Sequence, residues 1–129
     1  MKLENLDPLK DEAGLTEPKQ IFAKDCRLIK QADTFIVYLS DDISVGGSQE
    51  ILIARYLKKP VIGYAPFGGK FNGCRKEMLG TVIENYQDPF VFSTCDVVCG
   101  TLEEVADTLQ RASGLHSRGL VIIDEALAE

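Results

Sequence analysis

Residues 33–64 read DTFIVYLSDDISVGGSQEILIARYLKKPVIGY, and this stretch decides the fold. Its first apolar run, FIVYL, is β-branched and aromatic and hardly alternates with polar residues, which is typical of a strand buried on both faces of a parallel sheet. We expect that strand over 33–40, a helix from about 48 to 58 that ends before Pro60, and a second strand over 61–66. A strand, a helix and a strand in this order predict a βαβ unit.

The flanking segments continue the alternation of helices and strands. Upstream, Thr16 as the N-cap and Pro18 in the first turn predict a helix to about Ala32, after an irregular leader over 1–17. Downstream we expect a loop over 67–73, a helix over about 75–86, a strand over 89–94, a helix that Thr101 and Glu104 cap and that ends near Ala112, and a last strand over 119–124. The pattern predicts one α/β domain over 1–129, a three-layer sandwich with a mostly parallel, flavodoxin- or Rossmann-like sheet.

Composition and charge exclude several classes of protein. A chain of 129 residues with 45% apolar content is long enough for one buried core. A net charge of −6 argues against binding a nucleic acid polymer, which requires a cationic face. The apolar runs are far shorter than the ~20 residues of a membrane span, and the first residues, MKLENLDPLKDE, lack the apolar core of a signal peptide. We therefore expect a cytoplasmic protein with no membrane partner.

The cysteines and the single histidine do not indicate a metal site. The chain has four cysteines, and a core of this size does not require disulfides. Cys95 and Cys99 form a C-x3-C pair, but no second pair lies near them in the sequence, and His116 lies in a predicted loop. We expect reduced thiols, a solvated histidine, and neither a metal nor a cofactor.

The turn before the central helix has the composition of an anion site. In open α/β sheets, ligands bind beyond the carboxyl ends of the strands, and the segment DDISVGGSQE follows the first predicted strand. Glycines let an anion approach the unpaired N–H groups at a helix N-terminus. We expect Ser44, Gly46, Gly47 and Ser48, with Asp42 in the same loop, to bind a phosphate or a polar sugar.

Two acids are candidates for chemistry. Glu50 is expected in the first turn of the helix, where the dipole favours its ionised form and makes it a candidate nucleophile. Asp25 lies three residues after Phe22 and four before Ile29, so it is on the apolar stripe of the first helix. Both residues also have ordinary interpretations: Glu50 as a first-turn or capping acid, and Asp25 as a solvated or ion-paired residue at the edge of its helix.

Two segments carry a resemblance to a known family. FAKDCRLIKQADTFIVYL, over 22–39, and SVGGSQEILIARYLKKPVIGY, over 44–64, resemble the nucleoside 2-deoxyribosyltransferases and their relatives that hydrolyse nucleoside 5′-monophosphates. The family pattern begins with an acid in a helix, followed by the motif I-x-x-A-D that leads into a strand. After the strand come a small residue, any residue, a glycine, three further residues and a glutamate. The helix that follows ends in a lysine–proline step before the next strand. The matching positions here are Asp25, Ile29, Ala32, Asp33, Ser44, Gly46, Glu50 and Pro60.

The resemblance implies roles for these residues. Glu50 would attack the anomeric carbon of a (deoxy)ribosyl group, and Asp25 would orient the base or the nucleophile. Ser44 matches the serine of the monophosphate hydrolases, where transferases of free nucleosides often have an aspartate, and a hydroxyl donates to a phosphate that a carboxylate would repel. Asn72 would be near an asparagine that the family uses across a subunit interface, although a turn residue is the simpler interpretation. The substrate would be a nucleoside or a nucleoside 5′-monophosphate.

The chain departs from the family at its N-terminus. Members begin with a strand and a substrate-holding loop, and residues 1–20 cannot form that strand. Either the chain is shortened at its N-terminus, or residues 120–124 fill the gap in the sheet, or a partner chain supplies the strand. Because a missing strand leaves an unpaired sheet edge that must be covered, we expect a homo-oligomer. Three alternatives to this interpretation remain. The first is a catalytically inactive nucleotide-binding or assembly module, and the second is an unrelated flavodoxin-like binding protein. The third is a relative of the cytokinin-activating phosphoribohydrolases, although GGSQE does not match their Gly-Thr-x-x-Glu signature.

Overall fold

The protein is a mixed α/β molecule, and the computed structural model describes residues 17–111 and 114–129. Its elements follow in the order α1 (Pro18–Gln31), β1 (Phe35–Tyr38), α2 (Val45–Tyr56), β2 (Val61–Tyr64), β3 (Asn72–Met78), β4 (Thr81–Gln87), α3 (Pro89–Thr94), β5 (Val97–Cys99), α4 (Leu102–Gln110) and α5 (Val121–Leu127). Strands β1, β2 and β5 form a parallel sheet in the order β1-β2-β5, and β3 pairs with β4 in a separate antiparallel hairpin.

The sheet has helices on both faces. Val37 of β1 and Val61 of β2 pack in one cluster with Ile51 of α2 and Val91 of α3. On the other face, Ile62 and Cys99 pack with Val105 of α4. Because successive strand residues point to opposite faces, both faces of β2 and β5 are covered. The expectation that the first strand is buried on both faces is wrong, because Ile36 and Tyr38 of β1 are exposed.

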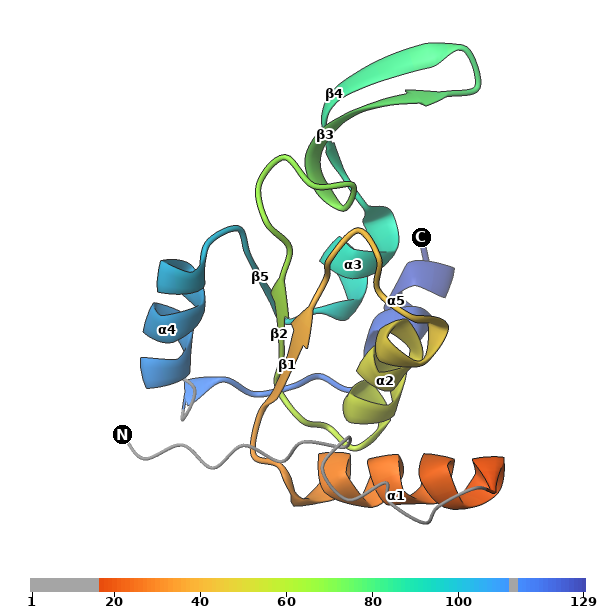
Figure 1. Cartoon of the computed structure of the whole chain (residues 1–129), viewed down its shortest axis with the longest axis vertical. Helices are drawn as coiled ribbons and strands as arrows, with labels where there is room; N and C mark the ends of the chain where they lie inside the picture. The colour runs from red at the N-terminus through yellow and green to blue at the C-terminus, as the bar shows by residue number, and fades with distance from the viewer. Residues whose placement is uncertain (1–16, 112–113) are drawn as a thin grey trace.

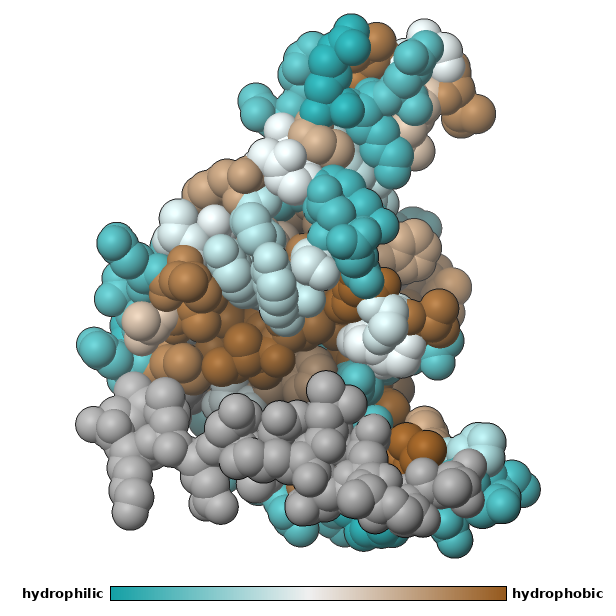
Figure 2. Space-filling model, viewed as in Figure 1, coloured by the Kyte–Doolittle hydropathy of each residue, from teal (hydrophilic) through white to brown (hydrophobic). Residues whose placement is uncertain are grey.

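Among the described residues, β1 is an edge strand, and its face on the α4 side is open. Its Phe35 pairs with Val61 of β2, so no strand lies between these two. Ile36 and Tyr38 are exposed, and the Tyr38 ring stacks on that of Tyr64 with 5.3 Å between centroids and 18° between planes. Figure 2 shows apolar side chains gathered at the centre of the molecule, below the hydrophilic hairpin.

The predictions for the first half of the chain are confirmed. α1, β1, α2 and β2 all lie where a helix or a strand was expected. α1 begins at Pro18 with Glu17 at the N-cap position, while Thr16 and the leader before it lie outside the described residues. α4 is also confirmed: Thr101 Oγ1 accepts the Glu104 N–H at 3.1 Å. The Glu104 carboxylate accepts the Gly100 N–H at 3.1 Å, so the reciprocal bond of the capping box reaches one residue further back.

The helix expected over 75–86 is wrong, because this segment is the β3–β4 hairpin (Figure 1). Leu79 and Gly80 have φ angles of 50° and 80°, so both central residues of the two-residue turn are left-handed, as a tight hairpin requires. Thr81, Val82 and Ile83 are β-branched and favour a strand. The apolar positions do recur at helical spacing, but a glycine in the middle costs a helix about 1 kcal/mol.

The strands expected over 89–94 and 119–124 are also wrong, because both segments are helical. The Asp88 carboxylate accepts the N–H groups of Phe90 and Val91 at 2.9 and 3.0 Å, and Pro89 occupies the first turn, so an N-cap and a proline start α3. α5 buries none of its residues and adds no strand to the sheet. The third strand is instead β5, whose three residues are too few to show a pattern in the sequence.

Gly63 leaves the space that α3 occupies against the sheet. A Cβ at this position would lie 2.7 Å from Cys95 Sγ and 3.1 Å from Leu39 Cδ1, and both neighbours are buried. We expect Gly63→Ala to lower the free energy of unfolding by about 1–3 kcal/mol, measured by urea denaturation. Gly46→Ala is the control: its Cβ meets only Ser44 Oγ, at 4.0 Å, and alanine favours a helix, so this variant should be no less stable than the wild type.

None of the described helices is both long enough and apolar enough to cross a bilayer.

Candidate functional site

The turn at the N-terminus of α2 forms three residues earlier than the sequence indicated. Ser44 is the N-cap, and its Oγ accepts the Gly47 N–H at 3.0 Å. Gly46 and Gly47 therefore lie within the first turn of the helix, and Ser48 Oγ donates to the Val45 carbonyl at 2.8 Å. A hydroxyl that accepts a hydrogen bond keeps its own proton, so Ser44 still has a donor for an anion. Ser44, Gly46 and Ser48 are exposed.

Glu50 consequently lies in the second turn of α2, and the expectation that it lies in the first turn is wrong, because α2 begins at Val45. The helix dipole acts mainly within the first turn, so it does little for this residue. Glu50 is half-buried, and burial raises the pKa of its carboxyl above the usual 4.5, with the Asp25 carboxylate raising it further. The environment therefore favours the protonated form, in contrast to the ionised form that the expected dipole interaction predicted.

Asp25 and Glu50 are brought together, as the position of Asp25 on the apolar stripe of α1 suggested. α1 packs against α2, and the charge of Asp25 acts on Glu50 across this contact. Asp25 Oδ1 is buried and has no hydrogen-bond partner among the described residues. A buried carboxylate oxygen without a donor is unusual, so this atom marks a place where a ligand N–H or O–H would be stabilised.

The helix that carries Asp25 does not lie beyond the carboxyl ends of the strands, where we expected the acid pair. Figure 1 shows α1 at the end of the molecule opposite the β3–β4 hairpin, and the hairpin follows the carboxyl end of β2. The N-terminal turn of α2 is the part of this region that follows the carboxyl end of β1.

The other predicted binding residues have different surroundings. Asp42 is exposed in the loop after β1, and its neighbour Asp41 accepts the Lys70 N–H at 2.9 Å. Asn72 is only 5% exposed, and its Nδ2 donates to the Ala65 carbonyl at 2.9 Å. The Asn72 amide thus fixes the start of the hairpin from inside the protein.

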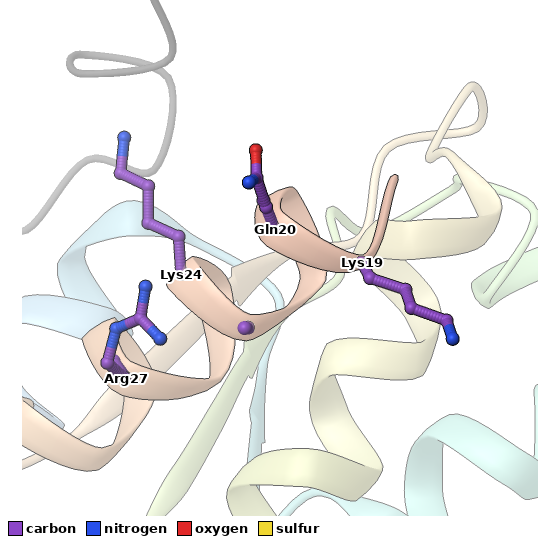
Figure 3. Close-up of a pocket in the computed structure, with 5 residues that line it drawn as sticks. Lys19, Gln20, Lys24 and Arg27 are labelled. Atoms are coloured by element: carbon purple, nitrogen blue, oxygen red, sulfur yellow. The ribbon is translucent and has the colours of Figure 1, made fainter. Parts of the chain in front are cut away.

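Two clefts in the described part of the chain lie elsewhere. One, of about 390 Å³, lies along α1 and is lined by Lys19, Gln20, Ala23, Lys24 and Arg27 (Figure 3). Lys24, Arg27 and Gln20 project to one side of the helix in this view, and Lys19 points away from them. The other cleft, of about 520 Å³, is lined by Lys70, Phe71, Cys74, Lys76 and Asp88 at the base of the hairpin. Neither cleft is lined by Glu50 or Asp25.

The lysines of the second cleft were missed in the sequence. The signal for them was local, because KFNGCRK, residues 70–76, has three cations in a chain with a net charge of −6. Assigning this stretch partly to a helix concealed that Lys76 and Lys70 would face the same space.

The thiols and the histidine form no metal-binding cluster among the described residues. In the part of the chain that the structure describes, no three metal-binding side chains gather, and the four cysteines are unpaired. Burial and the Asp96 carboxylate raise the pKa of the Cys95 thiol to about 12, although Arg55 acts in the opposite direction. Cys95 therefore stays protonated and unreactive at neutral pH. His116 is exposed, as expected for a loop residue.

Comparison with known proteins gives no relative: no family model, no curated protein and no solved structure matches the chain.

Proposed function

We propose that this protein transfers or hydrolyses the N-glycosidic bond of a (deoxy)nucleoside or a nucleoside 5′-monophosphate, with Glu50 as the nucleophile. The observation that supports the proposal is the pair formed by Glu50 and Asp25. These acids are 25 positions apart in the chain, lie on neighbouring helices, and interact closely enough for the Asp25 charge to raise the pKa of Glu50. Retaining glycosidases typically use two carboxyl groups that flank the glycosidic bond to be broken.

The spacing along α2 favours a phosphorylated substrate. Gly46 and Glu50 are four residues apart, so they lie on the same side of the helix, separated along its axis by about 6 Å at a rise of 1.5 Å per residue. That separation is comparable to the span of a ribose 5-phosphate. A phosphate bound by Ser44 and the Gly46 N–H would place the sugar along α2 towards Glu50.

The proposed reaction has two displacements. A Glu50 carboxylate oxygen bonds to C1′ while the C1′–N bond breaks, and the departing base takes the bonding electrons and then a proton. Water, or the nitrogen of a second base, then attacks C1′ and releases Glu50, so the configuration at C1′ is retained. The Asp25 carboxylate stabilises positive charge on the sugar in both transition states, and its free oxygen accepts a hydrogen bond from the sugar or the base.

The remaining proposals concern the fold and the assembly. We propose that the β1-β2-β5 sheet is the reduced centre of a flavodoxin-like three-layer sandwich without the first strand of the deoxyribosyltransferases. The open edge of β1, with exposed Ile36 and Tyr38, favours a homo-oligomer. No cofactor enters the reaction.

The test is incubation with a panel of nucleosides and nucleoside 5′-monophosphates, followed by chromatography for the free base. Release of base that saturates with substrate supports the enzyme, and a higher rate with the monophosphates supports the role of Ser44 and Gly46. Release no faster than in buffer alone for every substrate contradicts the proposal.

The second candidate function is a nucleotide-binding module without turnover, on the same turn. The raised pKa of Glu50 favours it, since burial and the Asp25 charge disfavour the ionised form that a nucleophile needs. Calorimetry with the monophosphates separates the two candidates, because the module binds the nucleotide and leaves its glycosidic bond intact.

The pH dependence follows from the direction of the Glu50 shift. A nucleophilic Glu50 must be ionised, so kcat/KM should fall with acid at a pH above the ordinary glutamate pKa of 4.5. Asp25→Asn removes the like charge but leaves the burial, so the acid limb should move to lower pH without reaching the ordinary value. Stability depends on pH in the opposite direction, by linkage. The folded state holds this proton more tightly, so the contribution is fully present below pH 4.5 and is lost as the pH rises through the raised pKa.

Urea titrations of the wild type and Glu50→Gln across this range check the stability half of the prediction. The variant lacks the titrating group and should show a flatter profile, with its greatest relative gain at neutral pH. Parallel profiles for the two proteins would contradict the raised pKa.

A further inference from the structure

The β3–β4 hairpin projects from the body and is joined to it at one end (Figure 1). An isolated two-stranded hairpin is at best marginally stable in water. Most of its side chains beyond the base are exposed, including the fully exposed Leu79 at the tip, and its exposed ion pair joins Arg75 to Glu84 at 3.2 Å. The buried contacts that fix the hairpin on the body are therefore concentrated at its base, where Asn72 and Tyr86 are buried.

The 520 Å³ cleft lies at this joint. Lys76 and Cys74 belong to β3, Lys70 and Phe71 to the loop before it, and Asp88 to the segment that returns to the body. Anything that fills the cleft would contact the hairpin and the body at once.

Two ammonium groups line the cleft without neutralising partners. Lys70 Nζ lies 5.0 Å from the centroid of the Phe71 ring, and Lys76 Nζ lies 4.4 Å from that of Tyr86. Within residues 17–111 and 114–129, neither ammonium forms an ion pair with a carboxylate. Cation–π contacts orient the two lysines but leave their charge uncompensated.

The remaining polar groups in the cleft are already engaged in part. Asp88 Oδ1 accepts hydrogen bonds from two N–H groups of α3, and the Cys74 thiol donates to the Lys70 carbonyl at 3.5 Å. The cleft therefore offers two free cations against one carboxylate with a structural role. The cleft is therefore locally positive, although the chain has a net charge of −6.

We propose that this cleft binds a small dianion, a phosphate monoester or a dicarboxylate, between Lys70 and Lys76, and that the bound anion fixes the hairpin on the body. Lys76 moves with the hairpin and Lys70 belongs to the body-side loop, so a ligand that bridges them binds the ordered arrangement more tightly than a displaced one. Binding must then shift the hairpin towards the ordered state by that difference in affinity. The site is independent of Glu50 and Asp25, which do not line the cleft.

The experiment is an amide hydrogen-exchange and ¹⁵N NMR titration of the full chain with inorganic phosphate, phenyl phosphate and succinate, each against sodium chloride of equal ionic strength. We expect one saturable set of shifts over 70–88, separate from any that a phosphate at the α2 turn causes, and amide exchange in β3 and β4 that slows at least about tenfold at saturation. Phosphate and phenyl phosphate acting without succinate would assign the site to phosphate monoesters, and the reverse to dicarboxylates.

Variants distinguish a built site from general charge screening. Lys76→Met keeps an unbranched side chain over Tyr86 but removes the charge, and should weaken binding at least about tenfold, as should Lys70→Met. Arg75→Met removes a cation from the next position of the same strand and should leave binding unchanged. Shifts that do not saturate, or that Arg75→Met weakens as much as Lys76→Met does, overturn the proposal. Glu50→Gln should bind the anion normally, so a failure of the glycosidase proposal leaves this result unaffected.

Discussion

Replacing Arg55 with methionine is expected to lower the free energy of unfolding by about 3–5 kcal/mol, the largest stability effect of any substitution considered. Arg55 is 2% exposed and pairs through Nη1 with the Asp96 carboxylate, while its Nε donates to the Gly119 carbonyl at 3.0 Å. Asp96 Oδ2 also accepts the Val61 N–H at 2.7 Å. The pair thus ties α2, the starts of β2 and β5, and the segment before α5 together.

The cost arises because the substitution leaves Asp96 largely buried without its counter-ion. A buried charge without a partner is far more costly than the intact pair is stabilising. A loss of this size is a large part of the 5–15 kcal/mol that stabilises an ordinary domain, so the variant will unfold at much lower urea concentration.

Arg75→Met provides the matched control, since it removes the same side chain from the exposed pair with Glu84. Exposed pairs contribute at most about 1 kcal/mol, and this variant should unfold close to the wild type. Adding Asp96→Asn to Arg55→Met should recover part of the loss, because no buried charge remains. An Arg55→Met variant as stable as Arg75→Met would show that the buried pair does not hold these elements together.

Glu50→Gln is expected to slow the release of base by at least about 1,000-fold in the proposed reaction. Glutamine has nearly the same size and shape but cannot form the ester with C1′, so the first displacement is lost while binding at the α2 turn persists. Calorimetry with the nucleotide and chromatography of the base on one preparation separate these two effects.

Glu103→Gln is the control for this experiment, because it makes the same chemical change at an exposed acid in the first turn of α4. Its rate should equal that of the wild type. Should Glu50→Gln release base as fast as Glu103→Gln does, Glu50 is not the nucleophile and the proposed function fails.

Sequence patterns predicted the fold where local and tertiary preferences agree. The apolar run over 35–39, the Pro60 stop and the cap at Thr101 each favour one local structure, and β1, α2 and α4 follow them. Where an apolar run is short, periodicity does not separate a strand from a buried helix. In those segments, local residues determine the secondary structure. Asp88 as the N-cap and Pro89 in the first turn start the helix α3, and Leu79 and Gly80 form the turn of the hairpin.

The candidate site was predictable in part for a similar reason. Spacing placed Asp25 on the packed side of α1, and packing against α2 brought it to Glu50. Spacing could not show that Ser44 starts α2 early and moves Glu50 out of the first turn. The Arg55–Asp96 pair and the Lys70–Lys76 cleft join residues from separate elements, so only the folded chain reveals them.

The stacked rings of Tyr38 and Tyr64 give the protein an optical reporter of its own sheet. The chain has four tyrosines and no tryptophan, so nothing stronger masks their ultraviolet transitions. Two phenol chromophores 5.3 Å apart and 18° from parallel couple electronically, and circular dichroism detects that coupling. Because one ring belongs to β1 and the other to β2, the signal follows the separation of these strands without any attached dye.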